Sequence, residues 1–477
     1  MRIHLLGIGG TGMGSLAGLL LEAGHEVTGT DLKLYPPMSD MLAQIGVEPF
    51  EGYSAGNILR AKPELIVVGN VIRRDNPEAQ EALRSGIPYK SMPQALSDLF
   101  LEKRTPMVIS GTHGKTTAST LAAWLLDFAG EEPGFLIGGV GQNFKRGFRT
   151  GSGPFFVVEG DEYDTAFFDK GPKFLHYRPQ ACIITSIEFD HADIYGDLES
   201  IRKSFRLLAG IMPPDGLLVA NADDPEVMKV AKLARCRVAT YGIEGGEWRP
   251  ERVGASESGT SFFLDRAGAE FRLPMWGEHN LSNAVGIIAM LVESGIDPSR
   301  ISAGLPLFEG VKRRQELVAD IKGVAVIDDF AHHPTAVAKT IASMRERFPD
   351  RRVWAIFEPR SNTARRNFFQ KDFASALSTA DRVVVAGPYR AEAIAKGERF
   401  DSAEVADSIM RSGVDAHYIP DTGNIVEFVI RGVSAGDVVL VMSNGGFDDL
   451  IERLIGALKK RRIYASDDEV SPSRVPK

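Results

Sequence analysis

Short apolar runs alternate with segments of helical periodicity along most of the chain, and glycine or proline often separates them. In the first hundred residues this pattern predicts strands and helices in turn, at 2–6, 12–23, 25–30, 38–46 and 64–69. Strands that alternate with helices are typical of βαβ units, which build parallel sheets. A charged stretch that ends in a proline, at 101–106, then predicts a linker.

The alternation begins again after this linker and a third time near residue 310. The second cycle predicts a helix to about residue 129, a small antiparallel ribbon over 247–274, and strands at 107–110, 155–158, 181–185, 217–220 and 237–240. The third cycle predicts strands at 324–327, 353–357, 382–385 and 438–441.

A chain of 477 residues is too long for one hydrophobic core. We therefore expect three α/β domains in series and a disordered polar tail, at 1–103, 104–312, 313–465 and 466–477.

Composition and charge narrow the functional classes. A formal net charge of −8 argues against nonspecific binding to nucleic acid or to an anionic membrane. The two cysteines, Cys182 and Cys236, cannot form a disulfide framework or a zinc site by themselves, which fits a reducing compartment. The N-terminus lacks the apolar core of a signal peptide, and no run of about 18 apolar residues occurs. We expect a cytoplasmic protein without a membrane or nucleic-acid partner.

A glycine loop follows the first predicted strand. The sequence Gly7-Ile8-Gly9-Gly10-Thr11-Gly12 fits G-x-G-x-x-G at a strand–helix junction, and Asp31 ends the next strand. Such a loop lets backbone N–H groups approach a diphosphate, and the carboxylate suits a ribose hydroxyl. The expected ligand-binding residues are Gly9, Gly10, Thr11, Gly12 and Asp31. This pattern does not distinguish NAD from a UDP-sugar, and a turn with only a packing role is a third interpretation.

A second glycine loop, SGTHGKTT, lies between the strand at 107–110 and a long helix. In a phosphate loop, backbone N–H groups cradle the phosphates, the lysine reaches the terminal ones, and the hydroxyl ligates Mg²⁺. The loop is shorter than G-x-x-x-x-G-K-[ST], because residue 109 is isoleucine. The predicted ATP-binding residues are Gly111, Thr112, His113, Gly114, Lys115, Thr116 and Thr117.

Acidic residues follow the next two strands of this cycle. Glu159 ends the strand at 155–158 and precedes Asp161 and Glu162, while His191 lies in an acidic segment after the strand at 181–185. A carboxylate at a strand end beside a phosphate loop is typical of a Mg²⁺ site, so we expect Thr116, Glu159 and His191 to hold the metal. The alternatives are a solvated acidic loop and a structural histidine.

Two phosphate-binding loops in one chain indicate ATP energy used on a second nucleotide-bearing substrate. An NAD-dependent oxidoreductase needs only the first loop, and a simple ATPase only the second. A non-catalytic sensor of the same nucleotide would keep the first loop without needing Lys115 or Glu159, and both are present.

Seven motifs in this order resemble those of the Mur ligases, the ATP-dependent enzymes that build the peptide stem of peptidoglycan. The motifs are GIGGTGMG, GTHGKTT, VVEGDEYD, IEFDHAD, GEHNLSN, GVKRRQE and DDFAHHP. The resemblance implies a Rossmann-like N-terminal domain, a central P-loop ATPase domain with a mostly parallel sheet, and a Rossmann-like C-terminal domain. It also implies Mg²⁺ and ATP-driven formation of an acyl phosphate, followed by attack of an amine.

Within the family, GIGGTGMG and DDFAHHP resemble the branch that acts on UDP-N-acetylmuramate. EPRSNT and VMSNGGF resemble the members that add the tripeptide L-alanyl-γ-D-glutamyl-meso-diaminopimelate during peptidoglycan recycling. The alternative acceptor is L-alanine.

The resemblance also assigns residues outside the two loops. Lys115, Glu159, His191 and Arg314 are expected to be catalytic. Asn280, Asn283, Arg314 and Asp328 are expected at ATP, and Asn70 at the UDP-substrate. The expected acceptor-binding residues are His332, Arg360, Ser361, Asn362 and Asn444.

Two of these assignments have simpler structural alternatives, and one family feature is missing. The two asparagines near residue 280 suit a helix N-cap, and Arg360 suits a surface ion pair with Glu358. Some Mur ligases carry a carbamylated lysine about 15 residues beyond the metal histidine. Phe205 and Arg206 occupy that place here, so we predict no carbamylated lysine.

Overall fold

The computed structural model describes residues 1–34, 38–190 and 194–461. They form two compact units, each described here by itself. The first unit comprises residues 1–275 and 279–312, and the second comprises 276–278 and the chain from 313 onward. The predicted tail at 466–477 and His191 lie outside the described residues.

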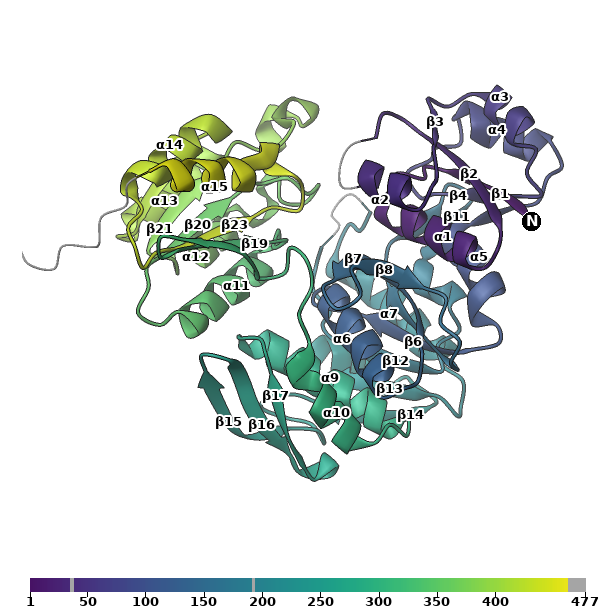
Figure 1. The fold of residues 1–477 in the computed structure, drawn as a ribbon, viewed down its shortest axis with the longest axis horizontal. Coiled ribbons are helices and arrows are strands. Elements are labelled where there is room, and N and C mark those ends of the chain that lie inside the picture. Colours follow the sequence, from purple (N-terminus) through teal and green to yellow (C-terminus); the bar gives the residue numbers. More distant parts are fainter. Residues whose placement is uncertain (35–37, 191–193, 462–477) are drawn as a thin grey trace, which may run out of the picture. The chain divides into compact units, whose positions relative to one another are not determined.

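The first unit begins with a five-stranded parallel sheet in the order β3-β2-β1-β4-β5. Its strands are β1 (Arg2–Leu6), β2 (Glu26–Asp31), β3 (Phe50–Glu51), β4 (Leu65–Val68) and β5 (Tyr89–Ser91). The helices are α1 (Thr11–Glu22), α2 (Met38–Gln44), α3 (Ala55–Ala61), α4 (Pro77–Arg84) and α5 (Met92–Leu96), followed by the π-helix η1 (Ser97–Leu101) (Figure 1). The apolar residues of β1 and β4 are buried, which is typical of a parallel sheet covered on both faces.

A seven-stranded sheet in the order β14-β13-β12-β6-β9-β7-β8 forms the centre of the first unit. Its strands are β6 (Thr105–Ser110), β7 (Gly134–Gly141), β8 (Arg146–Arg149), β9 (Phe155–Gly160), β12 (Ala181–Ile184), β13 (Leu217–Asn221) and β14 (Arg237–Tyr241). All neighbours are parallel except β7 and β8. The predicted linker at 101–106 is wrong at its end, because β6 already begins at Thr105. Thr105 pairs with β9 and is therefore part of the sheet.

Helices and two smaller sheets surround the central sheet. The helices are α6 (Lys115–Phe128), α7 (Leu198–Ile211), α8 (Pro225–Ala231), α9 (Glu278–Glu293) and α10 (Pro298–Gly304). The predicted ribbon is a three-stranded antiparallel sheet of β15 (Pro250–Ser256), β16 (Gly259–Leu264) and β17 (Ala269–Leu273). A hairpin of β10 (Asp164–Ala166) and β11 (Asp169–Pro172) leads into the short 3₁₀ helix η2 (Lys173–His176).

Helix α1, which follows the first glycine loop, packs directly on the central sheet. A Cβ atom on Gly18 would lie 2.1 Å from the Phe148 ring of β8, so only glycine fits there. At the end of α1, Glu22 accepts hydrogen bonds from Arg146 (2.5 Å) and from the backbone N–H of Thr150 (2.9 Å). These contacts hold the first glycine loop in a fixed place on the sheet that carries the second loop.

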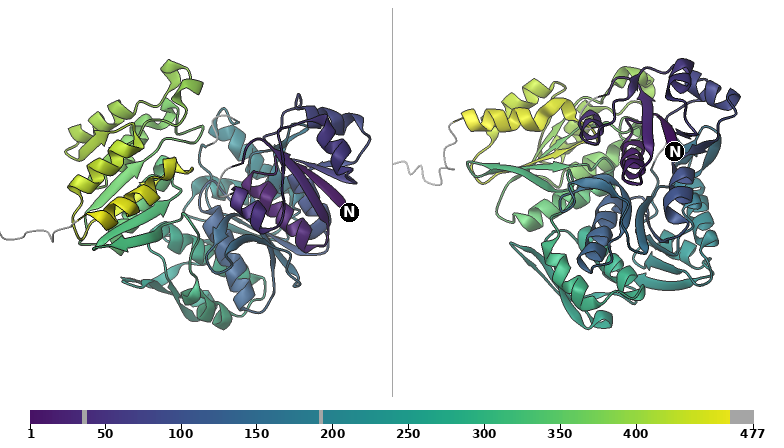
Figure 2. Two further views of the ribbon diagram at one scale, coloured as in Figure 1. Left: turned by 45° about the horizontal axis from the view of Figure 1, so that its top comes forward. Right: turned by 45° about the vertical axis from the view of Figure 1, so that its right-hand side comes forward.

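The second unit contains a six-stranded sheet in the order β18-β19-β23-β20-β21-β22, in which only β18 is antiparallel. Its strands are β18 (Glu316–Ile321), β19 (Val324–Asp329), β20 (Val353–Phe357), β21 (Arg382–Val385), β22 (Asp415–Tyr418) and β23 (Val438–Met442). Its α-helices are α11 (Pro334–Arg347), α12 (Gln370–Leu377), α13 (Ser402–Arg411), α14 (Thr422–Gly432) and α15 (Leu450–Lys460). Helices α11 to α13 pack on one face and α14 and α15 on the other, which gives two hydrophobic cores (Figure 2).

The predicted fold class is confirmed: the chain is a mixed α/β protein with mostly parallel sheets. Within the described part of the chain, no helix has both the length and the apolar composition needed to cross a membrane.

Candidate active site

The first glycine loop lies at the carboxyl ends of adjacent strands. It follows β1, while Asp31 ends β2 and the exposed Asn70 follows β4, and both of these strands pair with β1. The structure thus brings the predicted UDP-substrate residues to one edge of the N-terminal sheet, the edge where open α/β sheets bind ligands.

Asp31 braces this loop. Its Oδ2 accepts the N–H of Gly9 at 2.7 Å, and its Oδ1 accepts the Tyr53 hydroxyl at 3.1 Å and the N–H of Leu32 at 2.7 Å. A side chain on Gly9 would lie 2.8 Å from Asp31 Oδ2, so a glycine is required at that position. Any contact of Asp31 with a ribose must use the remaining lone pairs of these oxygens.

The second glycine loop has the backbone of a phosphate loop. Gly111 and Gly114 have φ angles of 130° and 83°, in the region that favours glycine, and α6 begins at the next residue, Lys115. A Cβ on Gly111 would lie 2.1 Å from Thr185 Oγ1. The Thr185 hydroxyl in turn donates a hydrogen bond to the His113 carbonyl at 2.6 Å, which fixes the turn ahead of the helix.

Glu159 and Thr116 come together beside this loop. Glu159 lies on β9, in register with Ile109 of the neighbouring strand β6. The Thr116 hydroxyl donates to Glu159 Oε2 at 3.4 Å, and the N–H of Gly138 donates to Oε1 at 2.9 Å. A hydroxyl and a carboxylate are the hard oxygen donors that suit Mg²⁺. The third predicted metal ligand, His191, lies outside the described residues.

The interpretation of the acidic loop after β9 as solvated is wrong for Glu162, which is buried, while Asp161 is partly buried. Glu162 is 1% exposed and accepts a hydrogen bond from Lys115 Nζ at 3.0 Å, while Asp161 Oδ1 lies 4.0 Å from the same atom. Lys115 Nζ also donates to the Gly111 carbonyl at 2.7 Å. Burial lowers the pKa of Lys115, but the charges of Glu162 and Asp161 outweigh it and raise that pKa, so Lys115 carries a positive charge.

The asparagines of α9 lie inside the helix and not at its cap. Helix α9 begins at Glu278, which makes the N-cap interpretation of Asn280 and Asn283 wrong. Both are nearly buried, and a Cβ on Gly114 would lie 2.6 Å from Asn283 Nδ2. Asn283 therefore packs against the phosphate loop.

In the second unit, Arg313 pairs with Asp328, one of the predicted ATP-binding residues. Arg313 Nε lies 3.2 Å from Asp328 Oδ2, and its Nη2 donates to the carbonyls of Ser443 and Gly445 at 2.7 Å. Arg314, the predicted residue, lies with its guanidinium carbon 4.6 Å from the centroid of the Phe330 ring. Burial raises the pKa of Asp328 to about 6, although the charge of Arg313 acts in the opposite direction.

The predicted acceptor residues follow β19, β20 and β23, which are neighbours in the second sheet. Arg360 and Glu358 follow β20, and Arg360 Nη1 lies 3.4 Å from Glu358 Oε1, as the ion-pair alternative predicts. Burial raises the pKa of Glu358, which accepts the Ser443 hydroxyl at 2.5 Å. Asn444 Oδ1 is buried and has no hydrogen-bond partner among the described residues.

Three predicted acceptor residues have local structural roles. Ser361 Oγ accepts the N–H of Ala364 at 3.0 Å, and Asn362 Oδ1 accepts Arg365 Nη2 at 2.5 Å. His332 Nδ1 lies 3.0 Å from the Phe330 carbonyl. These bonds shape the loops after β19 and β20.

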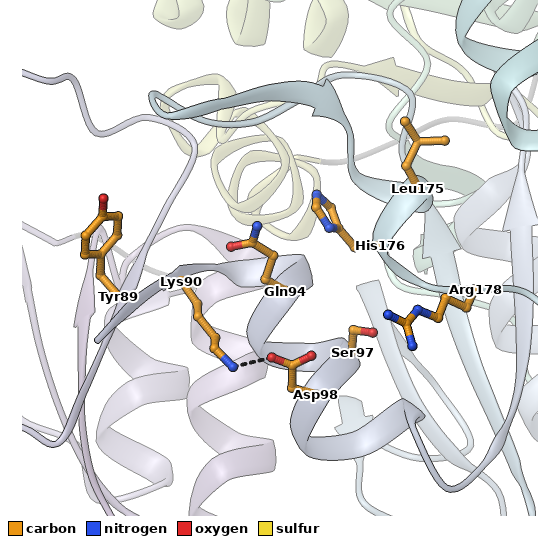
Figure 3. Close-up of a pocket in the computed structure, with 8 residues that line it drawn as sticks. All are labelled: Tyr89, Lys90, Gln94, Ser97, Asp98, Leu175, His176 and Arg178. Atoms are coloured by element: carbon orange, nitrogen blue, oxygen red, sulfur yellow. Dashed lines mark hydrogen bonds and ion pairs between the residues drawn. The ribbon is translucent and has the colours of Figure 1, made fainter. Parts of the chain in front are cut away.

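A separate cavity of about 440 Å³ lies in the first unit (Figure 3). It is lined by Tyr89, Lys90, Gln94, Ser97, Asp98, Leu175, His176 and Arg178. None of these is a predicted site residue, and Lys90 forms an ion pair with Asp98 inside it.

Sequence profiles of known families decide the class. The profile "Mur ligase family, catalytic domain" matches residues 2–104, "Mur ligase middle domain" matches 109–291, and "Mur ligase, glutamate ligase domain" matches 313–445. The chain belongs to the Mur ligase family. The predicted family and the predicted ATP-dependent ligase class are thereby confirmed, and the NAD-dependent oxidoreductase is excluded.

Individual Mur ligases match nearly the whole chain. A UDP-N-acetylmuramate–L-alanyl-γ-D-glutamyl-meso-2,6-diaminoheptandioate ligase of Escherichia coli is 39% identical over 97% of this chain and 99% of its own. A UDP-N-acetylmuramate–L-alanine ligase of Rubrobacter xylanophilus is 35% identical over 96% of this chain and 100% of its own. The crystal structure of a murein peptide ligase from Psychrobacter arcticus is similar with a TM-score of 0.73 and 35% identity, over 97% of this chain and 100% of that one.

The sequence did not single out two residues that contact predicted site residues. One is Arg313, which pairs with Asp328 and stands next to the predicted Arg314 in the motif GVKRRQE. Tyr389, whose ring lies under Arg360, carries no motif at all.

Proposed function

We propose that this Mur ligase joins the lactyl carboxylate of UDP-N-acetylmuramate to the amine of L-alanyl-γ-D-glutamyl-meso-diaminopimelate, in the cytoplasm, as a step of peptidoglycan recycling. ATP transfers its terminal phosphoryl group to the carboxylate, which gives an acyl phosphate and ADP. The peptide's amine then attacks the carbonyl carbon, and the tetrahedral intermediate loses phosphate to leave the amide. The observation that carries the proposal is the phosphate loop with Thr116 and Glu159 beside it, in one compact unit with the first glycine loop.

This chemistry asks the protein mainly to align anions and to offset their charge. The backbone N–H groups of the loop at 111–117 receive the phosphates, and Lys115 neutralises the terminal ones. Asn280 and Asn283 are assigned to the adenine of ATP. Arg314 and Asp328 are further ATP-binding residues in the proposal.

Mg²⁺ fits the donors beside the phosphate loop. The hydroxyl of Thr116 and the carboxylate of Glu159 are hard oxygen ligands 3.4 Å apart, and His191 is the third proposed ligand. When bound, Mg²⁺ supplies positive charge that offsets the charge of the phosphates.

The UDP-substrate is assigned to the edge of the N-terminal sheet. Gly9, Gly10, Thr11 and Gly12 stand at the N-terminus of α1, where the helix dipole and the N–H groups of the first helical turn favour a diphosphate. Asp31 and Asn70 end the neighbouring strands. Helix α1, which carries these residues at its start, packs on the central sheet through Gly18 and Phe148.

The acceptor is assigned to the loops after β19, β20 and β23. Arg360 offers a guanidinium for a carboxylate of the tripeptide, and its fork can bind that carboxylate with two hydrogen bonds. Glu358 and the unpartnered Asn444 Oδ1 offer oxygen atoms to an ammonium group. The distal end of meso-diaminopimelate carries both a carboxylate and an ammonium group. L-alanine has only its reacting amine and one carboxylate.

L-alanine is the second candidate acceptor, because L-alanine ligases also match nearly the whole chain. Steady-state ADP release with UDP-N-acetylmuramate and each acceptor in turn separates the two. The proposal predicts a much larger kcat/KM with the tripeptide, and a larger value with L-alanine contradicts it.

A further inference from the structure

Lys173 is a buried lysine that the reaction described so far does not use. It opens the short helix η2 and is 8% exposed. Its Nζ lies 3.0 Å from Asp161 Oδ2 and 4.3 Å from the centroid of the Tyr163 ring. A buried ammonium group is costly unless it is paired, so these contacts define where the charge of Lys173 acts.

Asp161 connects Lys173 to the phosphate loop. One of its oxygens, Oδ2, faces Lys173 at 3.0 Å, and the other, Oδ1, faces Lys115 Nζ at 4.0 Å. Lys115 also donates to Glu162 at 3.0 Å. The buried carboxylate of Glu162 and the partly buried carboxylate of Asp161 therefore hold the lysine that must turn toward the phosphates of a nucleotide, and Lys173 neutralises Asp161.

Helix η2 is firmly held, so Lys173 acts from a fixed position. Phe174 is fully buried, with its ring centroid 5.8 Å from that of Phe205. His176, which lines the cavity in Figure 3, pairs with Asp169 of β11 at 2.7 Å. Both contacts anchor η2 independently of Asp161.

We propose that Lys173 is a positioning residue of the phosphate loop: it holds Asp161 so that Lys115 can leave its carboxylate partners and bind the nucleotide's terminal phosphates. Without Lys173, the full charge of Asp161 would attract Lys115 in a poorly screened interior, where charge interactions are strong. Lys115 would then stay with Asp161 and Glu162 instead of the phosphates. The inference rests on the proposed function only in taking the nucleotide to be ATP or ADP.

Binding of MgADP, measured by calorimetry, tests the role directly. Lys173→Met is expected to weaken MgADP binding by roughly 10–100-fold, the size of a charged buried contact. Lys173→Arg, which keeps the charge, should bind within about threefold of the wild type. The matched control is Lys170→Met, which removes an exposed lysine that pairs with Asp164 of the same hairpin and should leave binding unchanged.

A purely structural role for Lys173 predicts other results. It would lower the affinity for UDP-N-acetylmuramate as well, whereas the positioning role leaves that affinity unchanged. The double variant Asp161→Asn/Lys173→Met should recover part of the MgADP affinity, because the carboxylate that holds Lys115 is gone. No recovery, or an equal loss for both ligands, would overturn the inference.

The outcome is separable from that of the proposed function. Wild-type MgADP binding by a folded Lys173→Met protein overturns this inference alone. If Lys173→Met does not fold, Lys173→Gln is measured in its place with the same two outcomes. A wild-type protein that binds MgADP but forms no amide contradicts the proposed function and leaves the role of Lys173 standing.

Discussion

The guanidinium of Arg360 lies flat against Tyr389, with 3.7 Å between its central carbon and the centroid of the ring. A Cβ on Gly445 would lie 1.8 Å from Arg360 Nε, so the backbone of the loop after β23 also approaches the guanidinium closely. Arg360 is thus packed against both an aromatic ring and a glycine, and it loses little further freedom when it binds a carboxylate. A cation held in this way fits the proposed tripeptide acceptor, which carries several carboxylates.

We predict that Arg360→Ala lowers kcat/KM for the tripeptide by roughly 10–100-fold, because it removes a charged hydrogen-bonded contact of about 1.5–3 kcal/mol. Apparent affinities for ATP and UDP-N-acetylmuramate should hardly change. Initial rates with each substrate varied in turn measure this. Arg366→Ala is the control, because Arg366 pairs with Glu398 at the surface and should be neutral. An unchanged constant for the tripeptide shows that Arg360 does not anchor it.

Lys115→Ala should abolish ligation while UDP-N-acetylmuramate still binds. The two glycine loops follow strands of different sheets, so loss of the lysine leaves the first loop intact. An ADP-release assay measures the loss of ligation, and calorimetric titration with the UDP-substrate measures whether it still binds. Lys145→Ala, at an exposed lysine of the same sheet region, is the control. Loss of UDP-substrate affinity in a folded Lys115→Ala protein would count against separate sites.

The metal requirement should depend on Glu159. Removing divalent cations with a chelator is expected to stop ADP release, and added Mg²⁺ should restore it. Glu159→Gln should raise the Mg²⁺ concentration for half-maximal rate by at least about 10-fold, the loss that even outer-shell substitutions cause. A titration of the rate with Mg²⁺ measures the shift, and identical curves for variant and wild type would remove Glu159 from the metal site.

Asp328 should make stability depend on pH. Its pKa is raised from 3.8 to about 6, chiefly by burial, so the folded state binds more protons than the unfolded state between these values. This contribution is present below about pH 4 and is lost as the pH rises through 6, with a total of about 3 kcal/mol. Relative to Asp328→Asn, the wild type should therefore lose stability over this window. Denaturant unfolding of both proteins from pH 4 to 7 measures the difference, and a constant difference contradicts the shift.

The local parts of the site could be predicted from the sequence. A phosphate loop is one strand, one turn and one helix, so Lys115 and Thr116 are fixed by neighbours in the chain. Glu159 followed because it ends a strand of the same sheet. The carboxyl ends of parallel strands meet at one edge of the sheet, so an acidic residue at a strand end lies at the edge where ligands bind.

The remaining parts depend on packing between distant segments. Tyr389 reaches Arg360 because β21 lies beside β20, and the order of strands in a sheet could not be predicted from the sequence. Lys173 reaches Asp161 only after the hairpin of β10 and β11 turns the chain back. Arg313, which pairs with Asp328, has a left-handed backbone with φ of 61°, and its residue type does not predict that conformation.

A competition between the two acceptors tests the central claim most directly. The enzyme is given ATP, Mg²⁺ and UDP-N-acetylmuramate with equal concentrations of L-alanyl-γ-D-glutamyl-meso-diaminopimelate and L-alanine, and the products are identified by mass spectrometry. The account predicts that UDP-N-acetylmuramyl-tripeptide is the main product and that one ADP forms for each amide. UDP-N-acetylmuramyl-L-alanine as the main product, or ADP release without either amide, would contradict it.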